Sequence, residues 1–356
     1  MRIAIFTPDI SSNSLGRTYC LWLLMRANGW ETEVFAPRGG EIWGPLRGGD
    51  FAANCRTVDE DDPRLLAAVE AADLVLAVKP VETSFGRARR LARTAQRPLL
   101  LDVDDPDLEA ALSWRRPLRR FAKGMLKFSA VRKNKELKRL ALQADTIVSN
   151  PVLQAIYGGP VVPHVRDDRG SGAPHTSSKP SIAFVGTNRK HKGVDILREA
   201  VAHRQDLGIT LKLTDDAPED ARPWEQWVGM TSFDEGLALV ENADIVVIPS
   251  KDDGYAHGQL PAKLMDAMLA GRAVIVSDIE PMTWAVGSGG LTVEPSSVSA
   301  LASALGEVAS PDTRTSLGAQ ARERALALFT VEAHQDAFRA ICEGAVRRFS
   351  QETGTK

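Results

Sequence analysis

The chain has 356 residues, of which 25% are charged and 44% hydrophobic, and its formal net charge is −2. This length allows two domains, and the near-neutral balance excludes a whole-protein attraction to nucleic acid. The three cysteines, Cys20, Cys55 and Cys342, are odd in number and lack metal-ligand spacing, as is typical of buried thiols in a reducing compartment. Residues 1–9 enter a strand pattern rather than a signal peptide, and no apolar stretch reaches the roughly 20 residues of a membrane span. We therefore expect a cytoplasmic protein.

Two series of buried strands, each interleaved with helical segments, follow one another along the chain. The first series is expected at residues 3–7, 32–35, 74–78, 98–103 and 146–149. The second series is expected at residues 182–186, 210–213, 245–248, 273–277 and 291–293. Short apolar strands that alternate with helices are typical of parallel sheets covered on both faces. The sequence therefore predicts an α/β protein with two doubly wound, Rossmann-like domains.

The composition of residues 168–180, DRGSGAPHTSSKP, indicates a linker between these domains. We assign residues 1–167 to the first domain and residues 181–330 to the second. Residues 331–356 are interpreted as a final helix that is able to cross back to the first domain. Ligands of open α/β sheets bind at the carboxyl ends of the strands, so we expect a cleft between two facing domains.

Residues 243–271 combine a buried strand, a loop with glycines and a helix that opens at Pro261. Such a helix start presents free N–H groups and the positive end of the helix dipole to a phosphate. Lys263 adds a mobile positive charge, and Asp266, one turn further along, offers two acceptor oxygens for a ribose diol. An ordinary strand-loop-helix unit has the same pattern, so this segment alone does not decide the function.

The second domain opens with FVGTNRKHKGVDIL, in which Gly186 ends a strand and allows a ligand to approach the backbone closely. The following loop carries three cations, Arg189 and Lys192 among them. Lys192 and Lys263 both belong to loops at the carboxyl edge of the sheet, so we expect them to converge on one diphosphate. A solvated basic loop is the alternative.

These segments resemble the retaining glycosyltransferases of the large GT-B class, typified by bacterial glycogen synthase and mannosyltransferases (family 4). The resemblance rests on GTNRKHKG, GQLPAKLMD, VSNPVLQAIYGG, ADIVVIPS, AMLAGRAVIVSD and the closing RERALALFTVEAH. It implies a GT-B fold and retaining transfer of a sugar from a UDP- or GDP-linked donor. It implies no cofactor besides this nucleotide diphosphate-sugar co-substrate, no metal, and a first domain on the acceptor side.

The resemblance also implies a donor site in the second domain. The residues assigned to it are Gly186, Thr187, Arg189, Lys192, Gly229, Met230, His257, Ala262, Lys263 and Asp266. Thr187 stands where the family usually has arginine, so Arg189 is expected to take that role. The first carboxylate of the family's Glu-x7-Glu element falls on Gly258, so His257 or Asp253 is expected to substitute. Contacts to the base are expected from the loop around Gly229 and Met230.

In the first domain, Lys79 follows a strand after which family members often place a catalytic histidine. Asp104 and Asp105 follow the next strand, where many relatives have a His-Asp pair, and are candidates to orient or deprotonate an acceptor hydroxyl. The catalytic candidates are thus Lys79, Asp104, Asp105, Arg189 and Lys192. The acidic string at 102–107 also suggests a divalent metal, although we favour none, and a helix cap with a turn is the structural alternative.

Two further features of the first domain suggest ligands. Gly16 and Arg17 correspond to a loop that contacts acceptor or donor phosphate in relatives, with a plain helix-start glycine as the alternative. Residues 114–140 carry eleven Lys or Arg and one acidic residue, Glu136. Such a basic segment with aromatic residues predicts an anionic membrane surface as partner, with a solvated helix as the alternative.

The expected partners are therefore the nucleotide-sugar donor, a glycan or lipid-linked acceptor, and an anionic membrane surface, with no nucleic acid. A protein with these partners would be peripheral at the inner face of the cell membrane. Two other functions stay open from the sequence. One is a GT-B-shaped nucleotide-sugar epimerase, which needs no acceptor, and the other is a degenerate nucleotide-sugar-binding protein.

Overall fold

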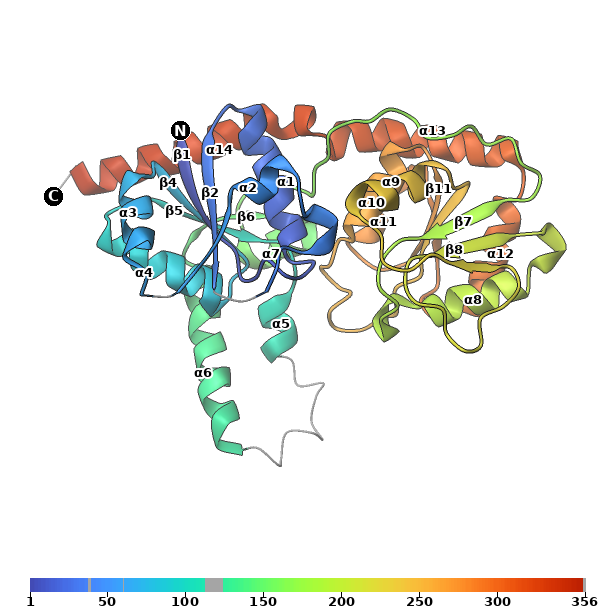
Figure 1. Ribbon diagram of the computed structural model, residues 1–356, viewed down its shortest axis with the longest axis horizontal. Helices are drawn as coiled ribbons and strands as arrows, with labels where there is room; N and C mark the ends of the chain where they lie inside the picture. The colour runs from blue at the N-terminus through green and yellow to red at the C-terminus, as the bar shows by residue number, and fades with distance from the viewer. Residues whose placement is uncertain (38–39, 60, 113–123, 355–356) are drawn as a thin grey trace. The chain divides into compact units, whose positions relative to one another are not determined.

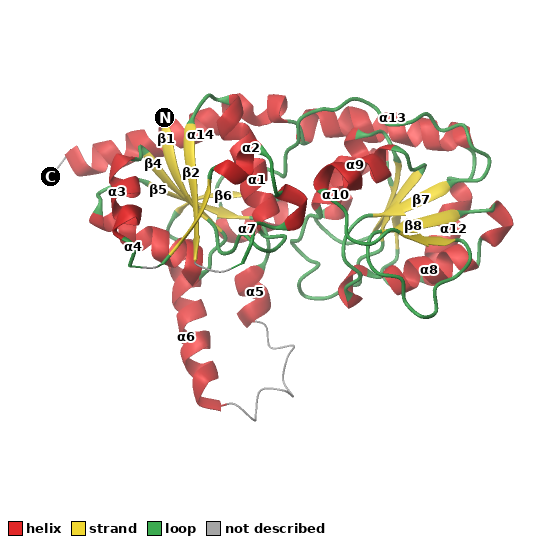
Figure 2. Ribbon diagram, in the orientation of Figure 1, coloured by secondary structure: helices red, strands yellow, loops and turns green. Residues whose placement is uncertain are grey.

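The computed structural model describes residues 1–37, 40–59, 61–112 and 124–354 (Figure 1). The chain divides into two compact units, of which the first combines Met1–Val165 with His334–Lys356 and the second is Arg166–Ala333. In each unit, helices cover both faces of one central sheet (Figure 2). Along the described part of the chain, no helix is long and apolar enough to cross a membrane.

The first domain contains a six-stranded sheet in the order β3-β2-β1-β4-β5-β6, in which every pairing is parallel. Its strands are β1 (Arg2–Phe6), β2 (Glu31–Pro37), β3 (Cys55–Val58), β4 (Leu74–Val78), β5 (Leu99–Val103) and β6 (Asp145–Val148). Its helices are α1 (Leu15–Ala27), α2 (Asp50–Ala53), α3 (Pro63–Ala71), α4 (Arg87–Thr94), α5 (Asp107–Leu112), α6 (Gly124–Ala141) and α7 (Pro151–Tyr157), with short turns η1 (Gly44–Leu46) and η2 (Glu82–Gly86). This is the order of dinucleotide-binding folds, and it reverses between β1 and β4.

The second domain repeats this topology in the sheet β12-β11-β10-β7-β8-β9, again with parallel pairings. Its strands are β7 (Ser181–Phe184), β8 (Thr210–Leu213), β9 (Glu225–Trp227), β10 (Ile245–Ile248), β11 (Ala273–Ser277) and β12 (Leu291–Val293). Its helices are α8 (Val194–Ala202), α9 (Phe233–Glu241), α10 (Ala262–Leu269), α11 (Met282–Val286), α12 (Val298–Glu307) and α13 (Pro311–Leu328), with turns η4 (Lys190–Lys192), η5 (Gln205–Leu207) and η6 (Gly287–Gly289). The strand order here reverses between β7 and β10, so the carboxyl ends of these two strands are the expected ligand position.

The alternation of side chains along β10 shows why these strands are apolar throughout. Ile245 and Val247 pack in the core cluster that includes α8 and α12. Val246 and Ile248 pack in the opposite cluster with α10 and α13. Because successive residues of a strand point to opposite faces, a sheet covered on both faces requires an uninterrupted apolar run.

The last helix, α14 (Val331–Gly354), belongs to the first unit from His334 onwards. The Arg339 side chain donates a hydrogen bond of 2.7 Å to the amide oxygen of Asn28, just after α1. Arg348 forms an ion pair of 2.7 Å with Asp145 at the start of β6. These contacts attach the end of the chain to the first sheet.

The fold predicted from the sequence is confirmed, and two strands are missing from the prediction. The predicted bounds of β4, β8, β10, β11 and β12 agree with the structure. The two strands without a predicted counterpart are β3 and β9, which lie at the edges of the two sheets. An edge strand pairs on one side only, and β3 (CRTV) exposes its central residues, so neither segment has the apolar run that identified the others.

Candidate functional site

Two lysine side chains of the second domain converge beside Gly186, which follows β7. A Cβ atom built on Gly186 would lie 3.2 Å from the Nζ of Lys192 and 3.7 Å from the Nζ of Lys263. Gly186 also has a φ of +132°, which disfavours any residue with a side chain. Glycine therefore keeps open the space that faces both ammonium groups.

Neither of these lysines has a carboxylate partner among the residues that the structure describes. The buried Nζ of Lys263 has no hydrogen-bond partner there and lies 3.6 Å from the ring centroid of Phe184. The Nζ of Lys192 donates to the hydroxyl of Thr187 at 3.3 Å. Burial without an anion is costly for an ammonium group, so an anionic ligand beside these two lysines would be stabilised by both of them.

The pKa values of both lysines are shifted in the direction that this environment dictates. Burial, together with repulsion from Lys192, lowers the pKa of Lys263 well below its ordinary range. Burial and the charge of Arg189 lower the pKa of Lys192 to about 8, while Asp215 acts in the opposite direction. A bound anion would stabilise the charged form of both amines.

The two loops at the reversal of strand order contact each other. A Cβ atom on Gly193 would overlap the carbonyl oxygen of Pro249, and the N–H of Lys251 donates to the carbonyl of His191 at 2.8 Å. The second loop leads into α10, with Pro261 as its N-terminal cap. The N–H groups of Ala262 and Lys263 are in the first turn, where the positive end of a helix dipole favours an anion.

The structure places the remaining predicted donor residues near the surface. Met230 is 72% exposed, and Gly229 before it has a φ of +73°. Arg189 is exposed, with its N–H bonded to the carbonyl of Thr187. His257 lies 2.7 Å from Asp252, and both side chains are more than half exposed.

The expected substitutes for the missing carboxylate at Gly258 have local partners. The Asp253 carboxylate accepts hydrogen bonds from the N–H groups of Tyr255 and Ala256 at 3.0 and 2.9 Å. The N–H of Gly258 donates to the carbonyl of Glu280 at 3.3 Å. The Asp253 carboxylate therefore stabilises the turn formed by residues 253–256.

Asp266 has an arginine partner that is far away in the sequence. The Nε of Arg166 lies 2.7 Å from Asp266, and the Arg166 guanidinium lies 5.4 Å from the ring centroid of Phe233. Burial raises the pKa of Asp266, and the charge of Arg166 opposes this shift. A role for Asp266 in ribose binding stays a prediction, and it now involves an ion-paired carboxylate.

In the first domain, Lys79 and three aspartates form a compact group that we call the Lys79 cluster. The Nζ of Lys79 lies 3.0 Å from Asp104, 2.6 Å from Asp105 and 2.9 Å from Asp107. Lys79 follows β4 and Asp104 follows β5, two adjacent strands, so the topology brings them to one edge of the sheet. Burial raises the pKa of Asp107 to about 6, with Lys79 acting in the opposite direction. Lys79, Asp104 and Asp105 were all catalytic candidates from the sequence, whereas Asp107 was not.

The role of Arg17 as a phosphate contact stays a prediction, and it now involves an ion-paired side chain. Its guanidinium is buried and forms a bidentate ion pair with Asp102, with distances of 2.6 to 3.1 Å. It also donates to the carbonyl groups of Val162 and Pro163. These contacts make Arg17 an internal connection between α1, β5 and residues 162–163. Gly16 lies in α1, where a Cβ atom would come 3.8 Å from Trp43.

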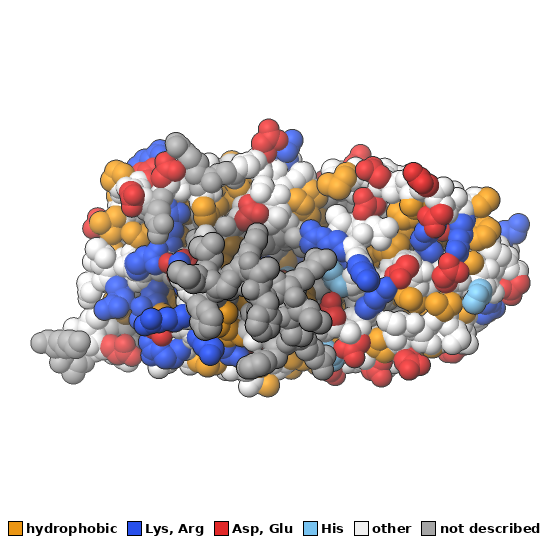
Figure 3. Space-filling model, turned by 90° about the horizontal axis from the view of Figure 1, so that it is seen from below, with side chains coloured by type: hydrophobic (Ala, Val, Ile, Leu, Met, Phe, Trp, Pro, Cys, Tyr) orange, Lys and Arg blue, Asp and Glu red, His pale blue; other side chains and the backbone are white. Residues whose placement is uncertain are grey.

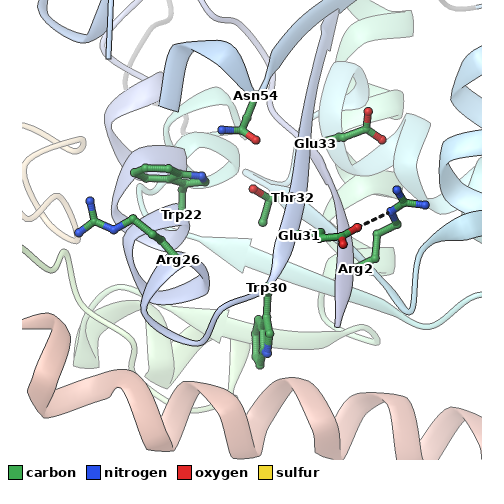
Figure 4. Close-up of a pocket in the computed structure, with 8 residues that line it drawn as sticks. All are labelled: Arg2, Trp22, Arg26, Trp30, Glu31, Thr32, Glu33 and Asn54. Carbon is green, nitrogen blue, oxygen red and sulfur yellow. Dashed lines mark ion pairs between the residues drawn. The ribbon is translucent and has the colours of Figure 1, made fainter. Parts of the chain in front are cut away.

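A separate hollow in the first domain lies at the amino-terminal ends of β1 and β2 (Figure 4). Its lining residues are Arg2, Trp22, Arg26, Trp30, Glu31, Thr32, Glu33 and Asn54. The guanidinium of Arg26 lies 5.2 Å from the Trp22 ring centroid, and the Trp30 ring lies 6.0 Å from that of Phe338. Both indoles thus already have neighbours, and we assign this hollow no ligand.

Comparison with known proteins agrees with this architecture. Residues 179–310 match the family model described as Glycosyl transferases group 1. A stretch of 103 residues is 35% identical to granule-bound starch synthase 1 of Pisum sativum and covers 26% of this chain. That match spans only 17% of the length of the starch synthase.

Solved structures that are similar to all or nearly all of this chain include those of two proteins. Sucrose-phosphate synthase from Thermosynechococcus elongatus is 18% identical with a TM-score of 0.63, and 100% of each chain is covered. Alr3699/HepE of Anabaena, in a complex with UDP, is 16% identical with a TM-score of 0.72, covering 97% of this chain and 100% of that one. The same Anabaena protein in complex with UDP-glucose is 13% identical with a TM-score of 0.67.

The paired doubly wound domains and these likenesses define a protein of the GT-B fold. Within the second domain, residues 179–310 match the family model of Glycosyl transferases group 1. The expectation of a GT-B fold is therefore confirmed, while membership of family 4 in particular stays a prediction.

Proposed function

We propose that the protein is a glycosyltransferase that moves a sugar from a nucleotide diphosphate-sugar to an acceptor hydroxyl. The observation that carries this proposal is the pair of ammonium groups of Lys192 and Lys263 beside Gly186, which have no carboxylate partner among the residues that the structure describes. In the reaction, the bond between the anomeric carbon and a diphosphate oxygen breaks, and the acceptor oxygen bonds to that carbon. The departing diphosphate carries the developing charge, and fixed cations aimed at such charge usually give the largest catalytic contribution.

The proposed donor is linked to UDP or GDP. Support for UDP comes from Anabaena Alr3699/HepE, which is described in complex with UDP and with UDP-glucose. In this scheme the N–H groups of Ala262 and Lys263 contact the diphosphate, and Arg189 supplies a further charge. Exposed Met230 and the open backbone at Gly229 offer an apolar contact to the base.

The proposed reaction retains the anomeric configuration and requires no metal ion. Asp104 and Asp105 in the Lys79 cluster are the proposed groups that orient the acceptor hydroxyl or take its proton. The Lys79 ammonium already supplies a positive charge beside these carboxylates. In the second domain the two lysines supply the charge that a metal would otherwise bring to the diphosphate.

The proposed acceptor is a glycan or a lipid-linked sugar reached at an anionic membrane surface. Residues 114–123 of the basic stretch 114–140 lie outside the described residues, whereas α6 carries the remainder. Lys133 of α6 and Arg90 of α4 both reach Glu82, at 3.6 and 2.5 Å, so the basic residues of these two helices are neighbours. Figure 3 views the first domain from the side towards which α6 extends in Figure 1, and Lys and Arg side chains gather on this face. This arrangement supports a peripheral location at the inner face of the membrane.

The membrane contact is testable with vesicles. We expect the protein to co-sediment with vesicles that contain anionic lipid and not with neutral vesicles, because each basic residue near such a surface contributes about 1 kcal/mol. Changing Arg132, Lys133, Lys135 and Arg139 to serine should release the protein while leaving UDP affinity unchanged. Failure of the wild-type protein to co-sediment at low salt would make α6 a solvated helix.

The transfer activity is testable by following nucleotide and sugar together. Incubation with UDP-glucose or GDP-mannose should release nucleotide only when an envelope glycan or lipid extract is present as acceptor. Conversion of the sugar without nucleotide release would indicate the epimerase instead. Tight binding of UDP or GDP with neither reaction would indicate a nucleotide-sugar-binding protein.

A further inference from the structure

We propose that Lys79 is a built-in cation that occupies a position suited to a divalent metal ion, and that removing its side chain converts the Lys79 cluster into a metal-binding site. This inference concerns the cluster itself and does not depend on the proposed glycosyl transfer. It assigns to Lys79 the role of holding three carboxylates together in a metal-free arrangement.

The geometry of the carboxylates supports this inference. Asp104, Asp105 and Asp107 each place one oxygen within 4.8 Å of the others. An ion such as Ca²⁺ binds carboxylate oxygens at about 2.3–2.6 Å, so one ion reaches oxygens up to roughly 5 Å apart. The Lys79 Nζ lies within 3.0 Å of all three groups. An ammonium group and a metal ion would therefore compete for the same oxygens and repel each other.

The backbone explains how a lysine reaches this position. Lys79 has a φ of +70°, a conformation that lysine rarely adopts. Its N–H donates to the carbonyl of Asp102 at 2.8 Å, which continues the pairing of β4 with β5 beyond the last residue of β4. The side chain is 7% exposed, so the ammonium group is enclosed with its three partners. A conformation of this kind persists because the surrounding contacts determine it.

The positive φ at position 79 allows a variant that removes the lysine side chain without straining the backbone. Glycine adopts positive φ without a steric penalty, so Lys79→Gly removes the side chain and its charge while the backbone fits at least as well. The variant leaves three carboxylates facing one another, an arrangement that a divalent cation stabilises. Lys79→Arg keeps the positive charge and serves as the conservative comparison.

The experiment measures thermal unfolding of the full chain with and without millimolar MnCl₂. We expect Mn²⁺ to raise the midpoint of Lys79→Gly by about 5 °C, because a ligand that binds only the folded state stabilises it. Wild type and Lys79→Arg should show no such rise. Lys251→Gly is the matched control, since Lys251 forms a 2.6 Å ion pair with a single carboxylate, Asp195, and its loss creates no cluster. Adding Asp107→Asn to Lys79→Gly should weaken the Mn²⁺ response at least severalfold.

Two results would overturn the inference. One is a folded Lys79→Gly protein, judged by circular dichroism, whose midpoint does not respond to Mn²⁺. The other is Mn²⁺ binding to the wild-type protein, detected by electron paramagnetic resonance of the free ion. If Lys79→Gly is unfolded alone, refolding it with Mn²⁺ should restore the native spectrum, and failure to do so counts against the inference.

Discussion

The carboxyl edges of the two sheets carry lysines in opposite electrostatic situations. In the first domain, one ammonium group, that of Lys79, faces three carboxylates. In the second domain, the ammonium groups of Lys192 and Lys263 share one space beside Gly186 without a carboxylate partner among the described residues. Both domains have the same strand order, so the topology provides the position and the local side chains decide its charge.

We call the Lys79 cluster the closed site, because its cation has partners within the protein. We call the pair of Lys192 and Lys263 the open site. A cation whose partners are within the protein contributes to the folded structure, whereas a buried cation without partners destabilises that structure until an anion binds. We therefore expect substitutions at the two edges to change stability in opposite directions.

The largest expected effect is a loss of stability in Lys79→Gly. Removing one partner of a buried ion pair leaves uncompensated charge, which typically costs about 3 kcal/mol or more. The Asp105 and Asp107 side chains are 17% and 23% exposed, so part of this cost is relieved by water. We expect the free energy of unfolding in urea without metal to fall by about 2–3 kcal/mol. An unchanged or higher stability would remove the distinction between the two edges.

A smaller effect is expected for Lys192→Met, and it depends on pH. The pKa of Lys192 is about 8 in the folded protein, below its ordinary value, so the unfolded chain binds more protons above pH 8. Stability of the ligand-free protein should therefore rise as pH increases through this window, and Lys192→Met should lack that contribution. Urea titrations of both proteins from pH 7 to 10 measure the difference. The same variant should weaken UDP binding by more than about 1 kcal/mol.

Above pH 8 the wild-type affinity for UDP should also decline, because Lys192 loses its proton in the free protein. Equal stability profiles for wild type and Lys192→Met would contradict the assignment of a displaced pKa. They would also remove the electrostatic argument for an anion at this position.

The smallest expected effect is that of chelation. Lys79 occupies the centre of the one acidic cluster suited to a metal in the described chain, so EDTA should leave sugar transfer within about twofold of its untreated rate. Loss of transfer in EDTA and its recovery with manganese would show that the Asp-rich turn is a metal site. That result would contradict both the metal-free proposal and the role given to Lys79.

The central elements of both domains were predictable from sequence because burial on two faces leaves a simple pattern. β4 (LVLAV) and β10 (IVVI) are apolar throughout, and their predicted bounds agree with the structure. Glycine and lysine after a strand, and lysine at a helix start, also indicated that Lys192 and Lys263 would share one edge of the sheet. These signals are local in the sequence.

Contacts between distant residues could not be predicted in the same way. Arg17 pairs with Asp102 across 85 positions of sequence separation, and Arg166 pairs with Asp266 across 100. Nothing local distinguishes an arginine that binds phosphate from one that is buried against an aspartate. Asp107 was also missed, because an aspartate in the first turn of a helix is ordinary. Its ion pair with Lys79 is visible only in the structure.

The most direct test of the open site is the binding of UDP and of uridine to wild type and Lys263→Met, measured by calorimetry. We predict that wild type binds UDP far more tightly than uridine. Lys263→Met should lose at least tenfold in UDP affinity, because a hydrogen bond to a charged group contributes about 1.5–3 kcal/mol, while its uridine affinity stays the same. Lys251→Met, whose lysine is already paired with Asp195, should bind UDP as wild type does. If Lys263→Met instead binds UDP within twofold of wild type, the buried ammonium group does not hold the diphosphate and the proposed donor site is wrong.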